Sequence, residues 1–307
     1  MTSIGRLSVE LQSYPGLDER ITILRAGDEV DAVFVRTERF NILVDTLSTP
    51  DLCQQVLDLI GSELDRRPLL VVNSHMDWDH YWGNCVVAGR APIIAHETAH
   101  RRFYDPANIA TLMRKAQEEE RFAGLQHVGP NVSFTGTMMI DGGDLILELL
   151  HTPGHTPDHI VVWIPQIRTC LAVDAVEAPI PEVWTDAPSD LAHLRNSLRM
   201  ISNLNAEFLV LAHGQTADPQ TVFRNIAYFD ALAQKVSEIN GDVLKDNTLI
   251  EIDGFGLEDF ITLPREMPEA TKAFYRKCHE TNLRATVNSR LRPSADAASV
   301  PPTHIPE

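Results

Sequence analysis

The sequence has few cysteines, no apolar run of membrane length and no recognisable leader. Its 307 residues include four cysteines (Cys53, Cys85, Cys170 and Cys278) and no C-x-x-C pair. That is too sparse for a disulfide scaffold or a cysteine zinc site, and it indicates reduced thiols. The N-terminal segment lacks a basic region followed by an apolar stretch, and no apolar run approaches the roughly 20 residues that a membrane helix needs. We therefore expect a cytoplasmic protein that does not associate with membranes.

Positive charge is also scarce. Lys and Arg number 26 against 43 Asp and Glu, which gives a formal net charge of −17. The densest basic segments are two arginine pairs, at residues 66–67 and 101–102, and three glutamates follow at residues 118–120. Because an acidic surface repels a phosphate backbone, we expect no nucleic-acid partner. The remaining composition is that of a globular protein with a sizeable core, since 44% of the residues are hydrophobic.

Apolar segments of strand length recur along the first two thirds of the chain. Residues 20–45 indicate a strand meander, and residues 48–67 a helix that Thr49 caps and Pro68 ends. Further strands are expected in LLVVNS (69–74), APIIAHE (91–97), MIDGGDLILELLH (139–151), HIVVWIP (159–165), TCLAVD (169–174) and EFLVLAHG (207–214). From Asp218 onward the apolar spacing is that of helices.

The stretch VVNSHMDWDHYWGN, residues 71–84, places two histidines and two aspartates within six positions. It begins in a predicted buried strand, so these side chains lie in the loop at that strand's C-terminal end, where layered α/β proteins usually bind ligands. In an extended segment, side chains two residues apart point to the same side. We therefore expect His75, Asp77 and Asp79 to converge, and His80 to join them once the loop turns.

Three more loops at strand ends carry similar side chains. They are His155 in HTPGHTPDH, Asp174 in CLAVDAVE and His213 in LVLAHG. Neutral imidazole and carboxylate groups are ligands of divalent first-row metals. Seven such side chains exceed one tetrahedral shell, which indicates two metal ions that share a carboxylate. Two ions about 3.5–4 Å apart can hold a bridging hydroxide and polarise a carbonyl or phosphoryl oxygen.

With these motifs the sequence resembles the metallo-β-lactamase-fold superfamily over about residues 20–215. SHMDWDHYWGN matches the superfamily's H-x-H-x-D-H motif in all but one place, and HTPGHTPDH is close to its third-histidine motif. The resemblance implies an α/β fold, an αββα four-layer sandwich with the metals in a groove at one edge of the two sheets. It also implies roles for single residues: His75, Asp77 and His155 on the first metal, Asp79, His80 and His213 on the second, Asp174 as the bridge, and Asp45 bracing the metal loop from outside.

Asp77 departs from that pattern, because most of the superfamily has histidine there. A carboxylate adds a negative charge among the ligands, which makes the centre a weaker Lewis acid and suits iron or manganese better than zinc. Three hypotheses follow. Asp77 is an ordinary ligand in a hydrolase, or it marks a di-iron redox site like that of the flavodiiron branch, or it is too short to reach the metal. Asp158 is a second departure, in place of a glycine, and we expect a surface turn there.

The chain divides into three predicted regions. Residues 1–217 form the metal-binding domain, with a helical insertion at about residues 97–127. Residues 218–287 form a C-terminal helical extension that packs on or near the active site. Residues 288–307 have little to bury and are predicted to form a disordered tail. We expect the insertion and the extension to act as a lid or as the contact of a homodimer.

These observations favour a dinuclear hydrolase in which a metal-bound hydroxide attacks the carbonyl carbon of an ester, lactone or thioester in a small-molecule substrate. Asp79 would orient the water or move its proton. Zinc is the expected metal, with iron or manganese as alternatives because of Asp77. Tyr81, Trp82 and Trp184 are candidate substrate contacts, and packing beneath the ligand loop is an equal alternative for Tyr81 and Trp82. The alternative functions are a di-iron oxidoreductase or oxygenase and a metal-retaining binding protein without catalysis.

Overall fold

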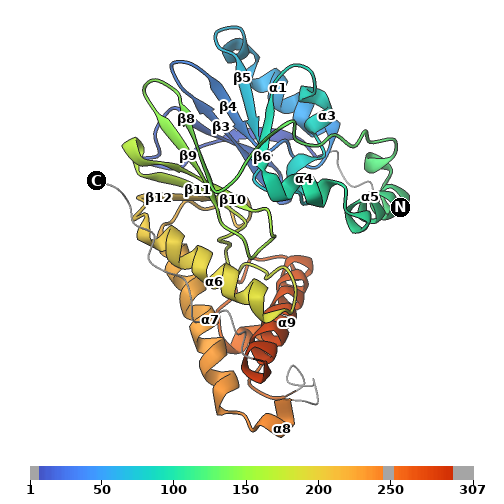
Figure 1. Cartoon of the computed structure of the whole chain (residues 1–307), viewed down its shortest axis with the longest axis vertical. Coiled ribbons are helices and arrows are strands. Elements are labelled where there is room, and N and C mark those ends of the chain that lie inside the picture. The colour runs from blue at the N-terminus through green and yellow to red at the C-terminus, as the bar shows by residue number, and fades with distance from the viewer. Residues whose placement is uncertain (1–6, 245–251, 293–307) are drawn as a thin grey trace.

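Two β-sheets packed face to face form a sandwich in the upper part of Figure 1. The computed structural model describes residues 7–244 and 252–292. The first sheet has the order β1-β2-β3-β4-β5-β6-β7, with antiparallel pairs up to β4 and parallel pairs from β4 to β7. Its strands are β1 Val9–Gln12, β2 Ile21–Ala26, β3 Val30–Arg36, β4 Asn41–Val44, β5 Leu69–Val72, β6 Ile93–His96 and β7 Val132–Phe134.

The second sheet has the order β12-β11-β10-β9-β8. Its pairs are antiparallel except for β11 and β12, which run parallel. Its strands are β8 Thr137–Asp141, β9 Ile146–His151, β10 Ile160–Ile164, β11 Thr169–Val173 and β12 Phe208–Leu211. Strands β10 and β11 are buried along their whole length, because both faces of this sheet are covered.

Apolar side chains fill the space between the sheets and both of their outer faces. Between the sheets, Ile23 and Val35 of the first sheet lie in one buried cluster with Leu149 and Val162 of the second. Helix α1 (Pro50–Leu64) covers the outer face of the first sheet, and α6 (Pro188–Asn203) covers that of the second. The layers are therefore helix, sheet, sheet and helix, which confirms the predicted αββα sandwich.

Local sequence signals explain where the helices begin. Thr49 accepts a hydrogen bond from the backbone N of Leu52 at 3.2 Å, and Pro50 occupies the first turn of α1, as predicted. The helix α6 was not predicted, although Leu191, Leu194 and Leu198 recur at helical spacing and are buried against the second sheet.

Residues 97–127 contain two helices and a short 3-10 turn that lie beside the metal loop. Their bounds are α4 Glu97–Phe103, α5 Pro106–Glu118 and η1 Glu120–Phe122. Every residue of α5 is at least partly exposed, whereas Phe122 is fully buried. Phe122 packs edge-on against Trp78 and Trp82 of the metal loop. Phe122 therefore holds this region against the loop that carries the histidines.

The C-terminal helices form a bundle with α6 at one end of the molecule (Figure 1). They are α7 Gln220–Glu238, α8 Gly241–Leu244, η4 Leu257–Asp259 and α9 Glu269–Leu291. The prediction of a tail from residue 288 was wrong for residues 288–291, which continue α9. Two contacts hold this end of the helix: Asn288 donates to the backbone O of Asp186 at 2.9 Å, and Arg290 donates to that of Val236. Residues 293–307 of the predicted tail lie outside the described residues.

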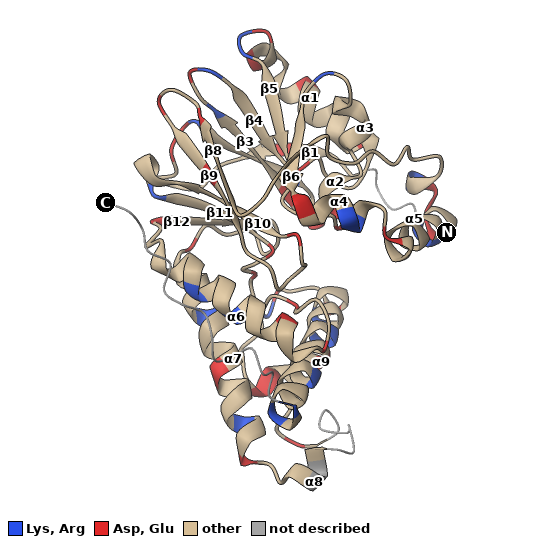
Figure 2. Cartoon of the chain, in the orientation of Figure 1, with Lys and Arg blue, Asp and Glu red and all other residues tan. Residues whose placement is uncertain are grey.

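The positions of charged residues and the hydropathy of the helices bear on the expected partners. Lys and Arg are spread over loops and several helices (Figure 2). Within the described residues, no helix has both the length and the apolar content needed to cross a bilayer. The predicted lack of a nucleic-acid partner is not tested by these observations and stays a prediction.

Candidate metal centre

The loop after β5 brings four polar side chains to one edge of the sandwich. Strand β5 ends at Val72, and Asp77 still has extended backbone angles as the N-cap of the short helix α2 (Trp78–Tyr81). The chain therefore turns from extended to helical directly after Asp77. This turn explains why His80 lies with His75 and not on the opposite side of the loop. A second short helix, α3 (Asn84–Val87), follows.

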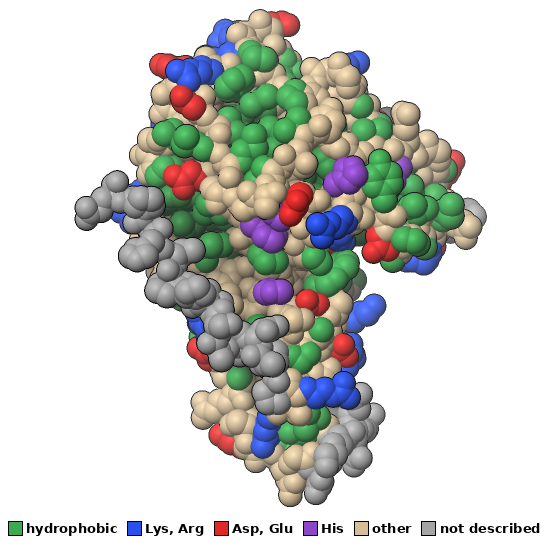
Figure 3. All heavy atoms as spheres, viewed as in Figure 1, with side chains coloured by type: hydrophobic (Ala, Val, Ile, Leu, Met, Phe, Trp, Pro, Cys, Tyr) green, Lys and Arg blue, Asp and Glu red, His purple; other side chains and the backbone are tan. Residues whose placement is uncertain are grey.

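Asp174 occupies the middle of the cluster. Its Oδ2 atom lies 3.1 Å from Nε2 of His80, 3.4 Å from that of His213, 3.5 Å from that of His75 and 3.6 Å from that of His155. Four imidazoles from three separate loops thus point at one carboxylate oxygen. The structure brings the sequence-predicted residues of all four loops to one place. Figure 3 shows histidine, acidic and basic side chains together on the molecular surface at the junction between the sandwich and the helical bundle.

Two groups of three side chains flank Asp174. In the first group, the Asp77 Oδ2 atom lies 3.6 Å from Nε2 of His75 and 3.4 Å from Nε2 of His155. In the second group, Asp79 Oδ2 lies 3.8 Å from Nε2 of His80 and 3.4 Å from Nε2 of His213. In each group one ligand atom from each residue lies within 4.8 Å of the others, which is close enough for all three to bind one ion. Asp77 is therefore long enough to reach its neighbours.

Hydrogen bonds on the far side of the rings leave the Nε2 atoms free. His80 Nδ1 lies 2.9 Å from Asp45 Oδ2, and His155 Nδ1 lies 3.1 Å from the backbone O of Glu182. Ser74 donates its hydroxyl proton to Asp45 at 2.6 Å, so its oxygen can accept from His75 Nδ1 at 2.9 Å. On each of these rings Nδ1 therefore carries a proton and Nε2 faces the cluster, where loss of its own proton leaves a lone pair for a metal. This is the tautomer that a metal needs.

The inner atoms of the cluster lack hydrogen-bond partners. Among the buried side-chain atoms of the described residues without a partner are Nε2 of His75, His80 and His155 and Oδ1 of Asp174. Buried polar atoms are nearly always satisfied, so three unsatisfied nitrogens aimed at one carboxylate, which itself has an unsatisfied oxygen, indicate a missing partner. Imidazole nitrogens and carboxylate oxygens fit a divalent cation. The residues present therefore fit the metal pair expected from the sequence.

The electrostatics of the cluster favour cations. Burial alone would raise the pKa of Asp174, but the imidazoles of His80 and His213 hold it well below its ordinary value. Burial opposes a charge on His155, yet the carboxylates of Asp77 and Asp174 raise its pKa to about 9. The carboxylates thus stay ionised and stabilise any positive charge placed between the rings. A divalent ion would take the place of these protons.

Asp45 supports the metal loop from behind. Its backbone has φ of 67°, in the left-handed region that aspartate tolerates better than most residues. Its Oδ1 atom accepts from the backbone N of Ser74 at 2.7 Å, and its Oδ2 atom accepts from Ser74 Oγ and faces His80. One buried carboxylate therefore fixes a loop residue and one histidine of the cluster.

His159 holds the Asp174 loop, and the sequence analysis gave it no role. The backbone N atoms of Asp174 and Ala175 donate to His159 Nε2 at 3.3 and 3.2 Å, and its Nδ1 lies 2.9 Å from Thr152 Oγ1. Burial, followed by the charges of the neighbouring histidines, holds the pKa of His159 well below its ordinary value. The ring is therefore a neutral acceptor. Its position four residues after His155, within the motif HTPGHTPDH, was the sequence feature that could have indicated a role near the cluster.

Arg102 and Asp158 form a network with Asp77 that the sequence did not reveal. Arg102 donates to Asp77 Oδ1 at 2.7 Å and to Asp158 Oδ1 at 2.8 Å. The expectation that Asp158 lies in a surface turn was wrong. Its side chain is fully buried, and its Oδ2 accepts from the backbone N of Met76 at 2.8 Å. A buried carboxylate needs such partners, and Arg102 and Met76 supply them.

Two of the three candidate substrate contacts are inaccessible. Tyr81 and Trp82 have 0% and 1% of their surface exposed, because they pack with Phe122 and Met76 beneath the metal loop. The expectation that they line the substrate groove was therefore wrong. Trp184 is 41% exposed, and the guanidinium carbon of Arg102 lies 4.4 Å from its ring centroid. Only Trp184 keeps its candidacy.

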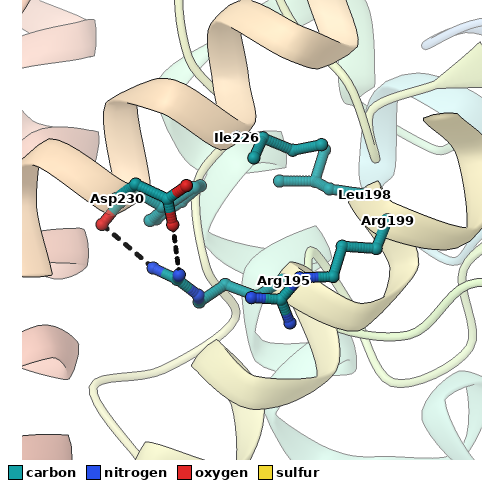
Figure 4. Close-up of a pocket in the computed structure, with 6 residues that line it drawn as sticks. Arg195, Leu198, Arg199, Ile226 and Asp230 are labelled. Atoms are coloured by element: carbon teal, nitrogen blue, oxygen red, sulfur yellow. Dashed lines mark hydrogen bonds and ion pairs between the residues drawn. The ribbon is translucent and has the colours of Figure 1, made fainter.

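A second hollow lies between α6 and α7 and does not involve the cluster (Figure 4). Arg195, Arg199, Leu198, Ile226 and Asp230 line it together with Phe229. An ion pair between Arg195 and Asp230 spans it. These side chains contribute to the packing of the two helices.

Comparisons with known proteins agree with this fold. The family model described as the metallo-beta-lactamase superfamily matches residues 25–213. The metallo-beta-lactamase type 2 of Bacillus cereus is 26% identical over 194 residues, which cover 61% of this chain and 68% of that protein. A metallo-beta-lactamase family protein from Thermus thermophilus has a TM-score of 0.60 at 19% identity and covers 92% of this chain and 93% of that one. A double mutant of the sec-alkyl sulfatase PisA1 has a TM-score of 0.62 at 18% identity, over 94% of this chain and 51% of that one.

Proposed function

The chain belongs to the metallo-beta-lactamase superfamily, and on this premise we propose that it is a dinuclear metal hydrolase that cleaves an ester, lactone or thioester bond in a small molecule. One observation carries the proposal. A single carboxylate oxygen, Asp174 Oδ2, lies within 3.6 Å of four imidazole Nε2 atoms, between two groups of three ligands. This arrangement suits two ions that share one ligand.

The proposed ligand sets follow the two groups. His75, Asp77 and His155 would hold one ion, Asp79, His80 and His213 the other, and Asp174 both. When bound, the ions would supply Lewis acidity and make a water molecule reactive at neutral pH. We propose zinc, with iron or manganese as alternatives because of Asp77.

Asp79 is the residue of this set that we propose to handle a proton. Burial would raise its pKa, but the imidazoles of His80 and His213 lower it below the ordinary value, so the side chain stays a carboxylate at neutral pH. It lies at the start of α2, and 9% of its surface remains exposed. A carboxylate in this position can accept a hydrogen bond from the attacking water and orient it towards the substrate.

The cysteines offer no competing nucleophile. Burial raises the pKa of Cys53 to about 12, and it also raises the pKa values of Cys85, Cys170 and Cys278. A thiol acts as a nucleophile only in its ionised form, which these environments disfavour. Water is therefore the proposed nucleophile.

The test combines metal content with turnover. Protein produced without added metal is analysed for its metal content and for its optical spectrum in air. It is then assayed against a panel of esters, lactones and thioesters. The panel also contains a β-lactam and a sec-alkyl sulfate, because the similar proteins include a metallo-beta-lactamase and a sec-alkyl sulfatase. We expect two zinc ions per chain, no colour, and hydrolysis of an ester-type substrate. The variant His155→Ala should lose about 100-fold or more in kcat/KM. The matched control is His193→Ala, an exposed histidine on α6, which should keep full activity.

Two other results would replace the proposal. Two irons with charge-transfer bands and no hydrolysis would favour the di-iron oxidoreductase or oxygenase. Full metal occupancy without turnover of any substrate in the panel would favour a binding protein. We also propose that the substrate is a small molecule and that the chain forms a homodimer.

A further inference from the structure

Asp77 uses its two oxygen atoms for different partners. Its Oδ2 faces His75 Nε2 and His155 Nε2 in the cluster, whereas its Oδ1 accepts from Arg102 Nη2 at 2.7 Å. A free carboxylate can bind a metal through one oxygen or through both. Here the oxygen that points away from the cluster is already occupied. Oδ2 is therefore the oxygen that the structure places beside the histidines for an ion.

Arg102 is itself held in place on three sides. Its Nη1 donates to Asp158 Oδ1 at 2.8 Å, and Asp158 in turn accepts from the backbone N of Met76, the residue between His75 and Asp77. Its guanidinium lies over the ring of Trp184. The Arg102 side chain is 12% exposed and that of Asp158 is fully buried. The guanidinium therefore cannot swing away without leaving a buried carboxylate unpaired, which is costly.

The contact also changes the charge that an ion would meet. Asp77 places a negative charge where a neutral imidazole would otherwise serve as ligand. Arg102 brings a positive charge to the same carboxylate, in a partly buried setting where water screens it weakly. Arg102 shares its positive charge between the carboxylates of Asp77 and Asp158, to which it donates at 2.7 and 2.8 Å. An ion bound at Asp77 therefore meets a ligand whose negative charge is partly offset.

We propose that Arg102 is a positioning residue that holds Asp77 as a one-oxygen ligand of the first metal and offsets its negative charge. The inference rests on the metal centre proposed above, and it explains how a carboxylate can be held in the position of an imidazole ligand there. A simpler role would be a clamp that closes α4 onto the metal loop. The two roles differ in what happens when Asp77 is replaced by a neutral ligand.

The experiment measures zinc binding by metal-free protein in competition with a chromophoric chelator. The variant Arg102→Met removes the donor that fixes Asp77 Oδ1 and keeps much of the side-chain stem. Because the loss of this orientation outweighs the weaker repulsion of the ion, it should weaken binding of one of the two zinc ions about 10–100-fold. The double variant Asp77→His/Arg102→Met restores a neutral ligand without a counter-charge, and it should recover most of that loss. Arg101→Met is the matched control, an exposed arginine one position earlier on α4, and it should bind zinc like the unmodified protein.

Three results would overturn the proposal. Unchanged zinc affinity in Arg102→Met would remove any role in binding. A double variant as weak as Arg102→Met would leave only the clamp. If thermal melting shows that Arg102→Met does not fold, the single variant Asp77→His tests the charge role. It leaves the Arg102 guanidinium facing a bound cation without the carboxylate between them. Asp77→His should then lose affinity for one zinc ion, and affinity equal to that of the unmodified protein would contradict the charge role. Since no turnover is involved, these outcomes are independent of whether hydrolysis is found.

Discussion

His80 Nδ1 lies 2.9 Å from Asp45 Oδ2, although the two residues are 35 positions apart in the chain. The same carboxylate accepts two hydrogen bonds from Ser74, whose oxygen lies 2.9 Å from His75 Nδ1. Asp45 thus acts on one histidine of each ligand group, directly on His80 and through Ser74 on His75. Removing this carboxylate should disturb both proposed metal positions.

The variant Asp45→Asn should weaken zinc binding about 10–100-fold with little change in the fold. An amide can present only one acceptor oxygen, so either Ser74 or His80 loses its partner. The His80 ring could then take the other tautomer, which places a proton on the Nε2 atom that faces the metal. Competition with a chromophoric chelator measures the affinity. Asp58→Asn, an exposed aspartate on α1, is the control, and equal zinc affinities for the two variants would contradict this role of Asp45.

Removal of metal should lower the melting temperature by about 5–10 °C. A ligand that binds only the folded state at 100 times its Kd adds about 2.7 kcal/mol to stability, and for domains of 150–250 residues each kcal/mol shifts Tm by about 2–4 °C. The cluster should respond in this way, because without an ion its carboxylates and imidazoles are buried together. Thermal melting with chelator, and again after zinc is restored, tests this expectation. The proposed centre would be contradicted if the melting temperature were the same before chelation, with chelator and after zinc is restored.

The seven residues of the cluster could be predicted because each follows a short apolar strand. Strands of one sheet end at a common edge, so His155, Asp174 and His213 needed only the sandwich to meet His75. The spacing of alternate side chains explained Asp77 and Asp79, and the turn after Asp77 explained His80. Here local pattern and fold agree, which is why the sequence was sufficient.

The remaining parts of the site depend on contacts between distant segments. Arg102 was visible only as one of a pair of arginines on a helix, and nothing local shows that this helix approaches Asp158, 56 positions away. Tyr81 and Trp82 adjoin the ligands in sequence, but a short helix sends successive side chains in different directions, and theirs enter the core. Nearness in sequence was a poor guide to exposure at these positions.

Asn282 connects the C-terminal bundle to the segment beside the cluster. It is fully buried on α9, donates to the backbone O of Pro181 at 2.9 Å and accepts from the backbone N of Val183 at 2.9 Å. The variant Asn282→Ala leaves both backbone groups buried without partners, and it should destabilise the protein by about 2–5 kcal/mol. Because Glu182 lies between them and its carbonyl fixes the His155 ring, zinc affinity should also fall.

Urea unfolding of the zinc-loaded protein measures the effect of Asn282→Ala. The control is Asn288→Ala on the same helix, which removes a single hydrogen bond to Asp186 at the surface and should cost about 1 kcal/mol or less. If the two variants were equally stable, the link between α9 and residues 181–183 would be unimportant for stability. A loss of stability in Asn282→Ala without any loss of zinc affinity would separate the bundle from the metal centre.

His279 should make the stability of the bundle sensitive to pH. The ring is fully buried on α9, with Nδ1 2.8 Å from the Tyr228 hydroxyl and Nε2 2.9 Å from the backbone O of Phe255. The Phe255 carbonyl can only accept, so the proton lies on Nε2, and Tyr228 donates to Nδ1. Burial lowers the pKa of His279 below its ordinary value of 6.5. Its stabilising contribution is therefore complete above pH 6.5, where both states are neutral, and is lost as the pH falls from 6.5 through the lowered folded-state pKa, because the unfolded chain takes up a proton first.

The variant His279→Gln has no such proton uptake, so its stability should fall less than that of the unmodified protein on acidification. One histidine changes the free energy of unfolding by at most about 1.4 kcal/mol per pH unit. Between about pH 7.5 and about pH 5.5, the unmodified protein should therefore lose more stability than His279→Gln, by an amount that approaches this value. Urea unfolding of both zinc-loaded proteins at about pH 7.5 and about pH 5.5 measures it, and comparing them cancels the shared response of the metal-site histidines. Tyr228→Phe removes the donor to Nδ1 and makes protonation of the folded ring easier, so its sensitivity to pH should lie between the two. Identical losses in the unmodified protein and His279→Gln would mean that the buried ring gains its proton without resistance, and the neutral hydrogen-bonded arrangement would then be wrong.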